Sequence, residues 1–236
     1  MIVSILTLFP SALDAYLRES VLRIAQEKGL VRIRLVDIRD YSTDRHRTVD
    51  DRPFGGGPGM VLKPEPVFAA VEDVERADGA HRKVLLTPDG ERFDQGRAKA
   101  YAREERLLLL CGRYEGYDER IRAGFDWDEV SVGDFVLSGG EIAALAVVEA
   151  TVRLVPGVLG DPDSARFESF EDDRLDFPQY TRPRRFRGMD VPEVLLSGDH
   201  EAVRRWREEA ARERTLRRRP DLGTSPPGPG GAEERA

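Results

Sequence analysis

Three glycine-bearing segments each follow a run of apolar residues, and they are the first candidates for chemistry. They span residues 87–90 (TPDG), 111–117 (CGRYEGY) and 131–141 (SVGDFVLSGGE). Glycine lets backbone amides and carbonyls approach a ligand closely, and open α/β sheets bind ligands where the C-terminal ends of strands gather. Any one of these loops is also explained as an ordinary strand end. The three together favour a small-molecule site.

A polar segment, DRHRTVDDRPFGGGPGM at residues 44–60, is the second candidate. It combines three arginines, one histidine, three aspartates and four glycines. Arginines suit phosphates, and a glycine run lets a flat base lie against the backbone. The segment therefore suggests RNA contact, with a flexible surface loop as the alternative.

Several familiar site signatures are absent. The chain has no GxxxxGK[ST], GxSxG or HExxH motif, and residues 57–62 fail GxGxxG at the last position. Cys111 is the only cysteine, and the only histidines, His46, His81 and His200, do not lie at metal-ligand spacing from it. The sequence thus disfavours a P-loop nucleotidase and a Rossmann dehydrogenase, excludes an intrachain disulfide and predicts no metal site.

The loops need a framework of alternating strands and helices, which the apolar pattern supplies. Strands are predicted at residues 2–8, 31–38, 83–87 and 107–111, and helices from Pro10 to Gly29, Pro64 to Ala77 and Asp94 to Glu104. The run LLLLC at 107–111 has no polar interruption, as in parallel strands covered on both faces. Alternation to about Leu154 predicts an α/β domain with a parallel sheet.

Beyond residue 154 the pattern changes. Residues 155–188 are rich in Pro, Asp and Arg and resemble a linker, after which residues 197–199 (SGD) are predicted to cap a helix. Residues 224–236 are Pro/Gly-rich and are predicted to be disordered. We therefore expect a small helical C-terminal domain and a disordered tail.

Charge is unevenly distributed along a chain of net charge −7. Residues 181–219 hold 12 arginines against 7 acids, whereas residues 1–180 hold 24 basic against 34 acidic side chains. This asymmetry indicates an anionic partner for the C-terminal part, although a solvated helix surface explains it equally well. The N-terminus lacks signal-peptide features and no apolar run reaches the length of a membrane span, so we expect a soluble, cytoplasmic protein.

The sequence resembles the bacterial tRNA (guanine-N1)-methyltransferase family, which modifies guanosine 37 beside the anticodon. The matching segments are DRHRTVDDRPFGGGPGM, CGRYEGYDERI, SVGDFVLSGGE, RLVPGVLG, YTRPRRFRGMDVPEVLLSGDH and RRWR. They lie between residues 2 and 222, and their length and irregularity make chance agreement negligible.

The resemblance implies a SPOUT-type fold, in which the parallel-sheet α/β domain carries a C-terminal trefoil knot. Knots are nearly absent from proteins at large, so this expectation depends on the resemblance alone. It also implies a homodimer with active sites at the interface. The predicted parts are a knotted cofactor-binding domain (1–160), a linker carrying the base (161–188), a small helical tRNA-binding domain (189–223) and the tail (224–236).

The resemblance further implies that the three loops hold S-adenosyl-L-methionine, the methyl donor. The residues expected to contact it are Leu86, Thr87, Pro88, Gly90, Gly112, Val132, Gly133, Asp134, Phe135, Val136, Leu137, Gly139 and Gly140. Magnesium stays open as an assisting ion, since the sequence carries no ligand signature for it.

The implied reaction requires proton transfer, because guanine N1 carries a proton at neutral pH. A general base must remove this proton, and a cation or donor at O6 would stabilise the charge that develops there. The resemblance assigns O6 to Arg153 and the base to a linker position where the family has aspartate before Ser-Phe. This chain has Glu168 there, with Asp172 and Asp173 nearby as rivals. We favour Glu168, reaching the base across the dimer interface.

Two alternatives stay open. One is another knotted methyltransferase that acts on a different RNA nucleotide. Residues 44–60 disfavour this alternative, but only through their resemblance to the family. The other is a catalytically silent RNA-binding relative, suggested by the change from aspartate to Glu168. In every case, the arginine-rich residues 182–219 are expected to grip RNA, in the family the anticodon arm of tRNA.

Overall fold

The computed structural model describes residues 1–160, 168–170 and 173–222. The chain divides into two compact units, Met1–Gly160 and Asp161–Ala236. Within the described residues, no helix combines the length and the apolar character that crossing a membrane requires.

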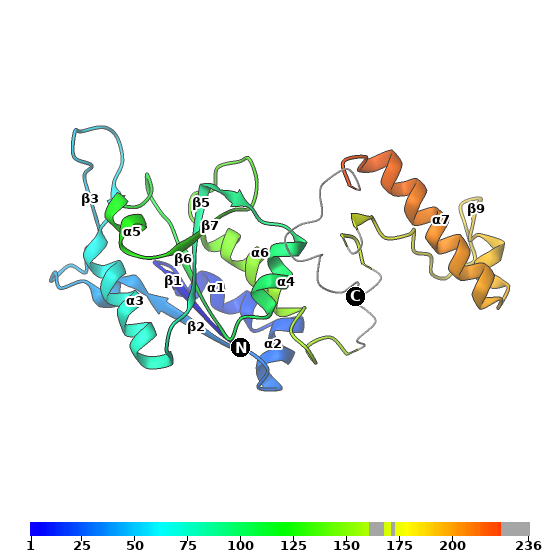
Figure 1. Ribbon diagram of the computed structural model, residues 1–236, viewed down its shortest axis with the longest axis horizontal. Helices are drawn as coiled ribbons and strands as arrows, with labels where there is room; N and C mark the ends of the chain where they lie inside the picture. Colours follow the sequence, from blue (N-terminus) through cyan, green and yellow to red (C-terminus); the bar gives the residue numbers. More distant parts are fainter. Residues whose placement is uncertain (161–167, 171–172, 223–236) are drawn as a thin grey trace, which may run out of the picture. The chain divides into compact units, whose positions relative to one another are not determined.

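The first unit is built on a five-stranded sheet with the order β2-β1-β6-β5-β7, in which all neighbours are parallel (Figure 1). The strands are β1 (Ile2–Thr7), β2 (Arg32–Asp37), β5 (Arg82–Arg92), β6 (Arg106–Cys111) and β7 (Trp127–Ser131). The predicted α/β class with a parallel sheet is confirmed.

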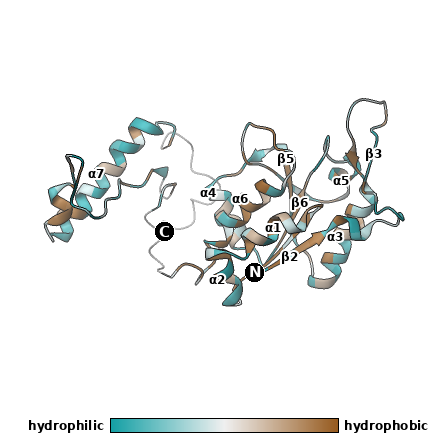
Figure 2. Ribbon diagram, turned by 180° about the vertical axis from the view of Figure 1, so that it is seen from behind, coloured by the Kyte–Doolittle hydropathy of each residue, from teal (hydrophilic) through white to brown (hydrophobic). Residues whose placement is uncertain are grey.

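Helices cover both faces of this sheet. One face carries α1 (Pro10–Leu17), α2 (Ser20–Glu27), α4 (Gln95–Ala102) and α6 (Glu141–Val152), and the other carries α3 (Pro64–Asp78), α5 (Glu119–Gly124) and the short helix η1 (Ile38–Tyr41). Figure 2 shows the apolar strands between these amphipathic layers.

Strand β6 supplies both hydrophobic cores. Leu107 and Leu109 pack on the α6 side, and Leu108 and Leu110 pack on the α3 side. All four side chains are at most 1% exposed. The alternation of side chains along a strand explains why this run has no polar residue.

The predicted single helix from Pro10 to Gly29 is wrong. Two helices, α1 and α2, occupy this stretch, and Ser20 at the start of the second has a φ of 48°. The side chain of Gln26 donates a hydrogen bond of 2.8 Å to the carbonyl oxygen of Leu17. That bond satisfies a terminal carbonyl of α1, so the chain can turn there.

The polar segment at residues 44–60 contains little regular structure. Its strand β3 (Asp50–Asp51) pairs antiparallel with β4 (Val61–Leu62). Four glycines in the loop between them, Gly55, Gly56, Gly57 and Gly59, have positive φ. Phe54, which precedes them, is fully exposed.

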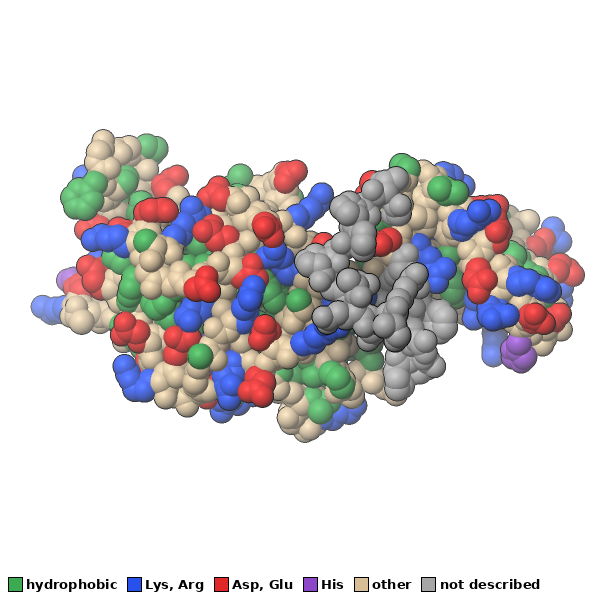
Figure 3. Space-filling model, viewed as in Figure 1, with side chains coloured by type: hydrophobic (Ala, Val, Ile, Leu, Met, Phe, Trp, Pro, Cys, Tyr) green, Lys and Arg blue, Asp and Glu red, His purple; other side chains and the backbone are tan. Residues whose placement is uncertain are grey.

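The second unit is dominated by α7 (His200–Arg218), with a hairpin of β8 (Arg185–Phe186) and β9 (Met189–Asp190) and the short helix η3 (Glu193–Leu196). The predicted cap is confirmed, because the side chain of Asp199 accepts hydrogen bonds from the amides of Glu201 and Ala202, both 3.0 Å. Figure 2 shows α7 as mostly hydrophilic, and Figure 3 shows basic and acidic side chains interspersed over it.

Candidate active site

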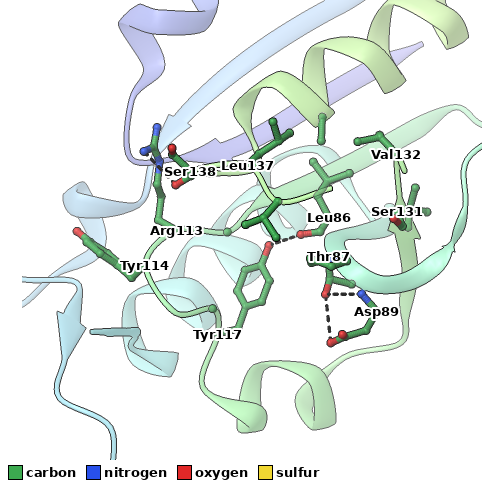
Figure 4. A pocket seen from close by; sticks show the side chains of 18 of the residues that line it. Leu86, Thr87, Asp89, Arg113, Tyr114, Tyr117, Ser131, Val132, Leu137 and Ser138 are labelled. Carbon is green, nitrogen blue, oxygen red and sulfur yellow. Dashed lines mark hydrogen bonds between the residues drawn. The ribbon is translucent and has the colours of Figure 1, made fainter. Parts of the chain in front are cut away.

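The three glycine-bearing loops line one cavity of about 440 Å³ (Figure 4). The first, residues 87–90, does not follow its strand as predicted but lies within β5, where the pairing with β7 is interrupted between Leu86 and Glu91. The other two follow the C-terminal ends of β6 and β7, the strands on either side of β5, so all three lie at the same edge of the sheet. That edge is the usual ligand site of open α/β sheets. The cavity also falls within the size range of small-molecule sites.

Most residues predicted to contact the cofactor lie in the wall of this cavity. They are Leu86, Thr87, Pro88, Gly112, Val132, Gly133, Phe135, Val136, Leu137, Gly139 and Gly140. Gly90 and Asp134 do not line it. A Cβ at Gly90 would lie 2.3 Å from the backbone nitrogen of Val130, so the absence of a side chain there permits β5 to pack against β7.

The first loop is held by two residues for which the sequence analysis predicts no role of their own, Tyr117 at the end of the second loop and Arg122 on α5. The Tyr117 hydroxyl donates a hydrogen bond to the carbonyl oxygen of Leu86 at 2.9 Å (Figure 4). It also lies 3.1 Å from the carbonyl oxygen of Leu110. Burial raises the pKa of Tyr117 well above its usual value, so the phenol stays protonated.

Arg122 is the other. It donates hydrogen bonds from Nη2 to Thr87 Oγ1 (2.9 Å) and to Asp89 Oδ2 (2.7 Å). This hydrogen bond and the Arg122 charge hold the pKa of Asp89 below its usual value. No short motif links Arg122 to the loop, since 35 residues separate it from Thr87.

The third loop is fixed at its end by the buried carboxylate of Glu141, the first residue of α6. Thr7 Oγ1 donates to Glu141 Oε1 at 2.8 Å, and Arg113 Nε donates to Glu141 Oε2 at 3.2 Å. Arg113 Nη1 also donates to the carbonyl oxygen of Ser138 at 3.2 Å, and its guanidinium lies 4.3 Å from the ring centroid of Phe9. A helix N-terminus favours this negative charge.

Gly140 joins the second and third loops. Its amide donates a hydrogen bond of 2.9 Å to the carbonyl oxygen of Gly112. A Cβ at Gly140 would lie 2.7 Å from the Cα of Cys111, a backbone atom that cannot move aside easily. The cavity wall therefore depends on a close backbone approach that only glycine allows.

The polar segment 44–60 lies beside the second loop. The amide of Glu115 donates to the carbonyl oxygen of Met60 at 2.9 Å, and the amide of Leu62 donates to that of Gly116 at 3.0 Å. The structure thus brings the candidate RNA-contacting segment next to the candidate small-molecule cavity.

The two predicted catalytic residues do not line this cavity. Arg153 caps the C-terminal end of α6, whereas the cavity lies at the N-terminal end. A helix of 12 residues is about 18 Å long. Glu168 lies in the second unit and lines a separate cavity of about 420 Å³. Its rival Asp173 is also in the second unit, and Asp172 falls outside the described residues.

The described parts of the chain contain no group of three or more His, Cys, Asp or Glu side chains placed to hold a metal ion.

A parallel sheet covered by helices on both faces, with a glycine-lined cavity at the C-terminal edge of its strands, defines an α/β protein with a candidate small-molecule site. The family model described as tRNA (guanine-1)-methyltransferase TrmD matches residues 1–225. A tRNA (guanine-N(1)-)-methyltransferase of Moorella thermoacetica is 54% identical over 224 residues, covering 94% of this chain and 90% of that protein. One of Geobacter sulfurreducens is 56% identical over 218 residues, covering 92% and 89%. The chain belongs to the tRNA (guanine-1)-methyltransferase TrmD family.

Proposed function

We propose that this protein transfers a methyl group from S-adenosyl-L-methionine to N1 of guanosine 37 in tRNA, in the cytoplasm. The observation that carries the proposal is the convergence of three glycine-bearing loops on one cavity, in a chain of this family. The segment 44–60, which lies beside the cavity, supports an RNA substrate.

The residues around the cavity fit the cofactor. The wall combines apolar side chains such as Leu86 and Leu137 with the hydroxyls of Thr87 and Ser131. Such a mixture suits a ligand with an aromatic base, a ribose and a charged amino acid end. When bound, its sulfonium supplies an electrophilic methyl group. The loops would hold and orient it, which is the main contribution a protein makes to such a transfer.

The chain must also remove the proton from guanine N1. We assign this step to Glu168, whose carboxylate would accept the N1 proton as the lone pair on N1 attacks the methyl carbon. Arg153 would donate hydrogen bonds to O6, where negative charge develops. The family has aspartate at the Glu168 position, so the longer side chain requires a different approach to N1. Asp172 and Asp173 are the rival bases.

A homodimer would complete the site. Within one chain, Arg153 lies at the far end of α6 from the cavity, about 18 Å along a helix of 12 residues. A second copy could place its own Arg153 and linker at the cavity. Exposed apolar side chains at the start of α6 and near the end of α1 support such an interface: Ile142 is 64% exposed and Tyr16 is 49% exposed.

The trefoil knot is part of the same proposal. We place it in the segment that carries the three loops, residues 86–140. Two features favour close threading there: the register of β5 on β7 shifts between Leu86 and Glu91, and Gly90 packs against the backbone of Val130.

The second unit would serve tRNA. We assign residues 161–188 to the linker that brings the base, and residues 189–223 to a small helical domain that grips the anticodon arm. The excess of arginine in residues 181–219 supports this role, because arginine side chains pair with phosphates.

The first experiment measures methyl transfer from labelled S-adenosyl-L-methionine to two tRNA transcripts. One carries guanosine at position 37 after another guanosine, and in the other only position 37 is changed to adenosine. Label on the first transcript alone supports activity, acceptor and position together. Label on both, or on a different nucleotide, points to another RNA methyltransferase, and label on neither points to a silent RNA-binding relative.

The second experiment tests the base. The Glu168→Gln variant should lose turnover and keep wild-type affinity for the cofactor, with Asp172→Asn and Asp173→Asn as comparisons. Intact turnover in Glu168→Gln rejects Glu168 as the base. Assays with EDTA and with added magnesium determine whether an ion assists. Sedimentation that shows a monomer at assay concentration would overturn the shared site.

A further inference from the structure

Thr215 on α7 has a buried side chain, and its hydroxyl both donates and accepts a hydrogen bond. Its Oγ1 donates a hydrogen bond of 2.8 Å to the carbonyl oxygen of Ala211, one turn earlier on the same helix. It also accepts a hydrogen bond of 2.9 Å from the amide of Leu175, which lies 40 residues away. The residue is 7% exposed. A buried hydroxyl with a long-range acceptor role fixes the backbone that donates to it.

The backbone that Thr215 holds belongs to the segment that carries the proposed base. The amide of Phe170 donates to the carbonyl oxygen of Arg174 at 2.7 Å, and the amide of Asp176 donates to Ser169 Oγ at 3.0 Å. These two bonds tie the residues that follow the base to those on either side of the Leu175 amide. The position of the base, which directly precedes Ser169, therefore depends on where α7 holds that amide.

Further contacts join the same segment to α7. Arg214 Nη1 donates to the carbonyl oxygen of Asp176 at 3.3 Å, and the Arg207 guanidinium lies 4.8 Å from the ring centroid of Phe177. Glu168 itself lines a cavity of about 420 Å³ together with residues of α7, among them Arg204. The bonds from the Leu175 amide to Thr215 and from Arg214 to Asp176 are both partly buried, and the bond from Thr215 to Ala211 is buried.

We propose that Thr215 is a positioning residue for methyl transfer: its hydroxyl fixes the Leu175 amide, and with it the placement of Glu168. This inference rests on the proposed role of Glu168 as the base. It gives α7 a second task besides gripping tRNA, because the same helix would set where the base-bearing segment lies. Thr215 would act through the Leu175 backbone, because its hydroxyl is bonded to Ala211 and Leu175.

The test compares Thr215→Val with Thr215→Ser. Valine keeps the size and shape of the side chain but cannot accept from Leu175, whereas serine keeps the hydroxyl. A neutral hydrogen bond contributes about 0.5–1.5 kcal/mol, so we expect a roughly three- to tenfold fall in the single-turnover rate for Thr215→Val. Thr215→Ser should restore the rate to within about twofold of wild type. Affinities for cofactor and for tRNA should not change in either variant.

Amide hydrogen exchange at Leu175 supplies a readout that does not depend on activity. The exchange rate of this amide should rise in Thr215→Val and return towards the wild-type value in Thr215→Ser. Faster exchange at Leu175 together with a wild-type single-turnover rate would overturn the proposal. Slower turnover with unchanged exchange would also overturn it, because the effect would then not run through the Leu175 amide.

Ser169→Ala covers the case in which Thr215→Val weakens α7 or tRNA binding. It removes the Ser169 Oγ to Asp176 bond from the other side and leaves α7 unchanged. A comparable fall in rate at wild-type tRNA affinity supports the proposal, and a wild-type rate overturns it. Glu168→Gln, assayed in parallel, distinguishes a failure of the base assignment from a failure of the positioning role. If it stays active, the assignment of the base fails; if it is inactive while Thr215→Val and Ser169→Ala are normal, only the positioning role fails.

Discussion

The hydroxyl of Thr7 and the carboxylate of Glu141 form a buried hydrogen bond of 2.8 Å between residues 134 positions apart in the sequence. Thr7 ends strand β1, and Glu141 begins α6 at the end of the third cavity loop. With Arg113 as its second partner, the Glu141 carboxylate connects the sheet, the second loop and the third loop. The contact links the core to the wall of the proposed cofactor cavity.

Replacing Glu141 by glutamine should weaken cofactor binding. The variant loses the charge that pairs with Arg113, and hydrogen bonds to charged groups contribute about 1.5–3 kcal/mol. We expect the dissociation constant for S-adenosyl-L-methionine to rise at least about tenfold and the melting temperature to fall, measured by calorimetry. Glu27→Gln is the matched control, because Glu27 pairs with Arg23 at the exposed surface. Equal affinities in the two variants would contradict the role of Glu141.

A methyl group at Gly140 or at Gly90 should damage the fold, for a different reason at each site. At Gly140 the added Cβ would lie 2.7 Å from Cys111 Cα and would push the second and third loops apart, whereas at Gly90 it would lie 2.3 Å from the backbone nitrogen of Val130. We expect each alanine variant to lose about 1–3 kcal/mol in urea unfolding, and Gly140→Ala to lose cofactor binding as well. Gly160→Ala is the control, since nothing lies within 4 Å of its Cβ. Wild-type cofactor affinity in Gly140→Ala would show that the cavity does not depend on the close backbone approach at Gly140.

Acid should destabilise the protein through Asp128. Burial alone would raise the pKa of Asp128, but hydrogen bonds from Tyr101 (2.6 Å) and Arg82 (2.9 Å), with the charge of Arg97, outweigh it and lower the pKa below its usual value. Since the folded state then binds the proton less readily than the unfolded chain, this contribution is present above about pH 4 and is lost as the pH falls.

The measurement is the urea midpoint between pH 3 and pH 7 for wild type and Asp128→Asn. At pH 7 the variant should be less stable by roughly 2–4 kcal/mol. Below about pH 4 the difference should shrink, because the wild type loses the same charge. Asp126→Asn, at an exposed neighbouring position, should follow the wild type throughout. A difference that stays constant with pH would show that the charge of Asp128 is not the cause.

Binding of tRNA should weaken steeply with salt. If the arginine-rich second unit grips phosphates, the logarithm of the affinity falls linearly with the logarithm of the salt concentration, by about 0.7–0.9 per phosphate contact. We expect Arg205→Gln on α7 to reduce this slope by about 1. Arg23→Gln on α2 should leave the slope unchanged. A flat salt response in the wild type would remove the proposed role of the second unit.

The sequence predicts the framework better than the contacts. Apolar runs and glycines identify the strands and the three loops, because both follow from local periodicity and turn geometry. Local patterns cannot predict the Thr7–Glu141 bond, because the two residues are 134 positions apart and share no motif. The break between α1 and α2 depends on a hydrogen bond from the side chain of Gln26, which the hydrophobic periodicity of the sequence does not reveal.

The resemblance to the family implies that Gly90 contacts the cofactor. In the structure, the lack of a side chain at Gly90 permits β5 to pack against β7. The resemblance also pairs Arg153 with the cavity, although the two lie at opposite ends of α6. The placement of Arg153 follows from how a single chain folds, and its catalytic assignment stays a prediction that depends on a second copy.

The position of β1 between β2 and β6 has a consequence for protein synthesis. Ile2–Leu6 pair with residues 106–110, so one edge of the first strand stays unpaired until about 100 more residues have been made. At about 5–20 residues per second this takes roughly 5–20 s. During that time the nascent chain displays an apolar strand with a free edge, a known target for aggregation. We expect production of the folded enzyme to be sensitive to chaperone supply and to translation speed between Thr7 and Arg106.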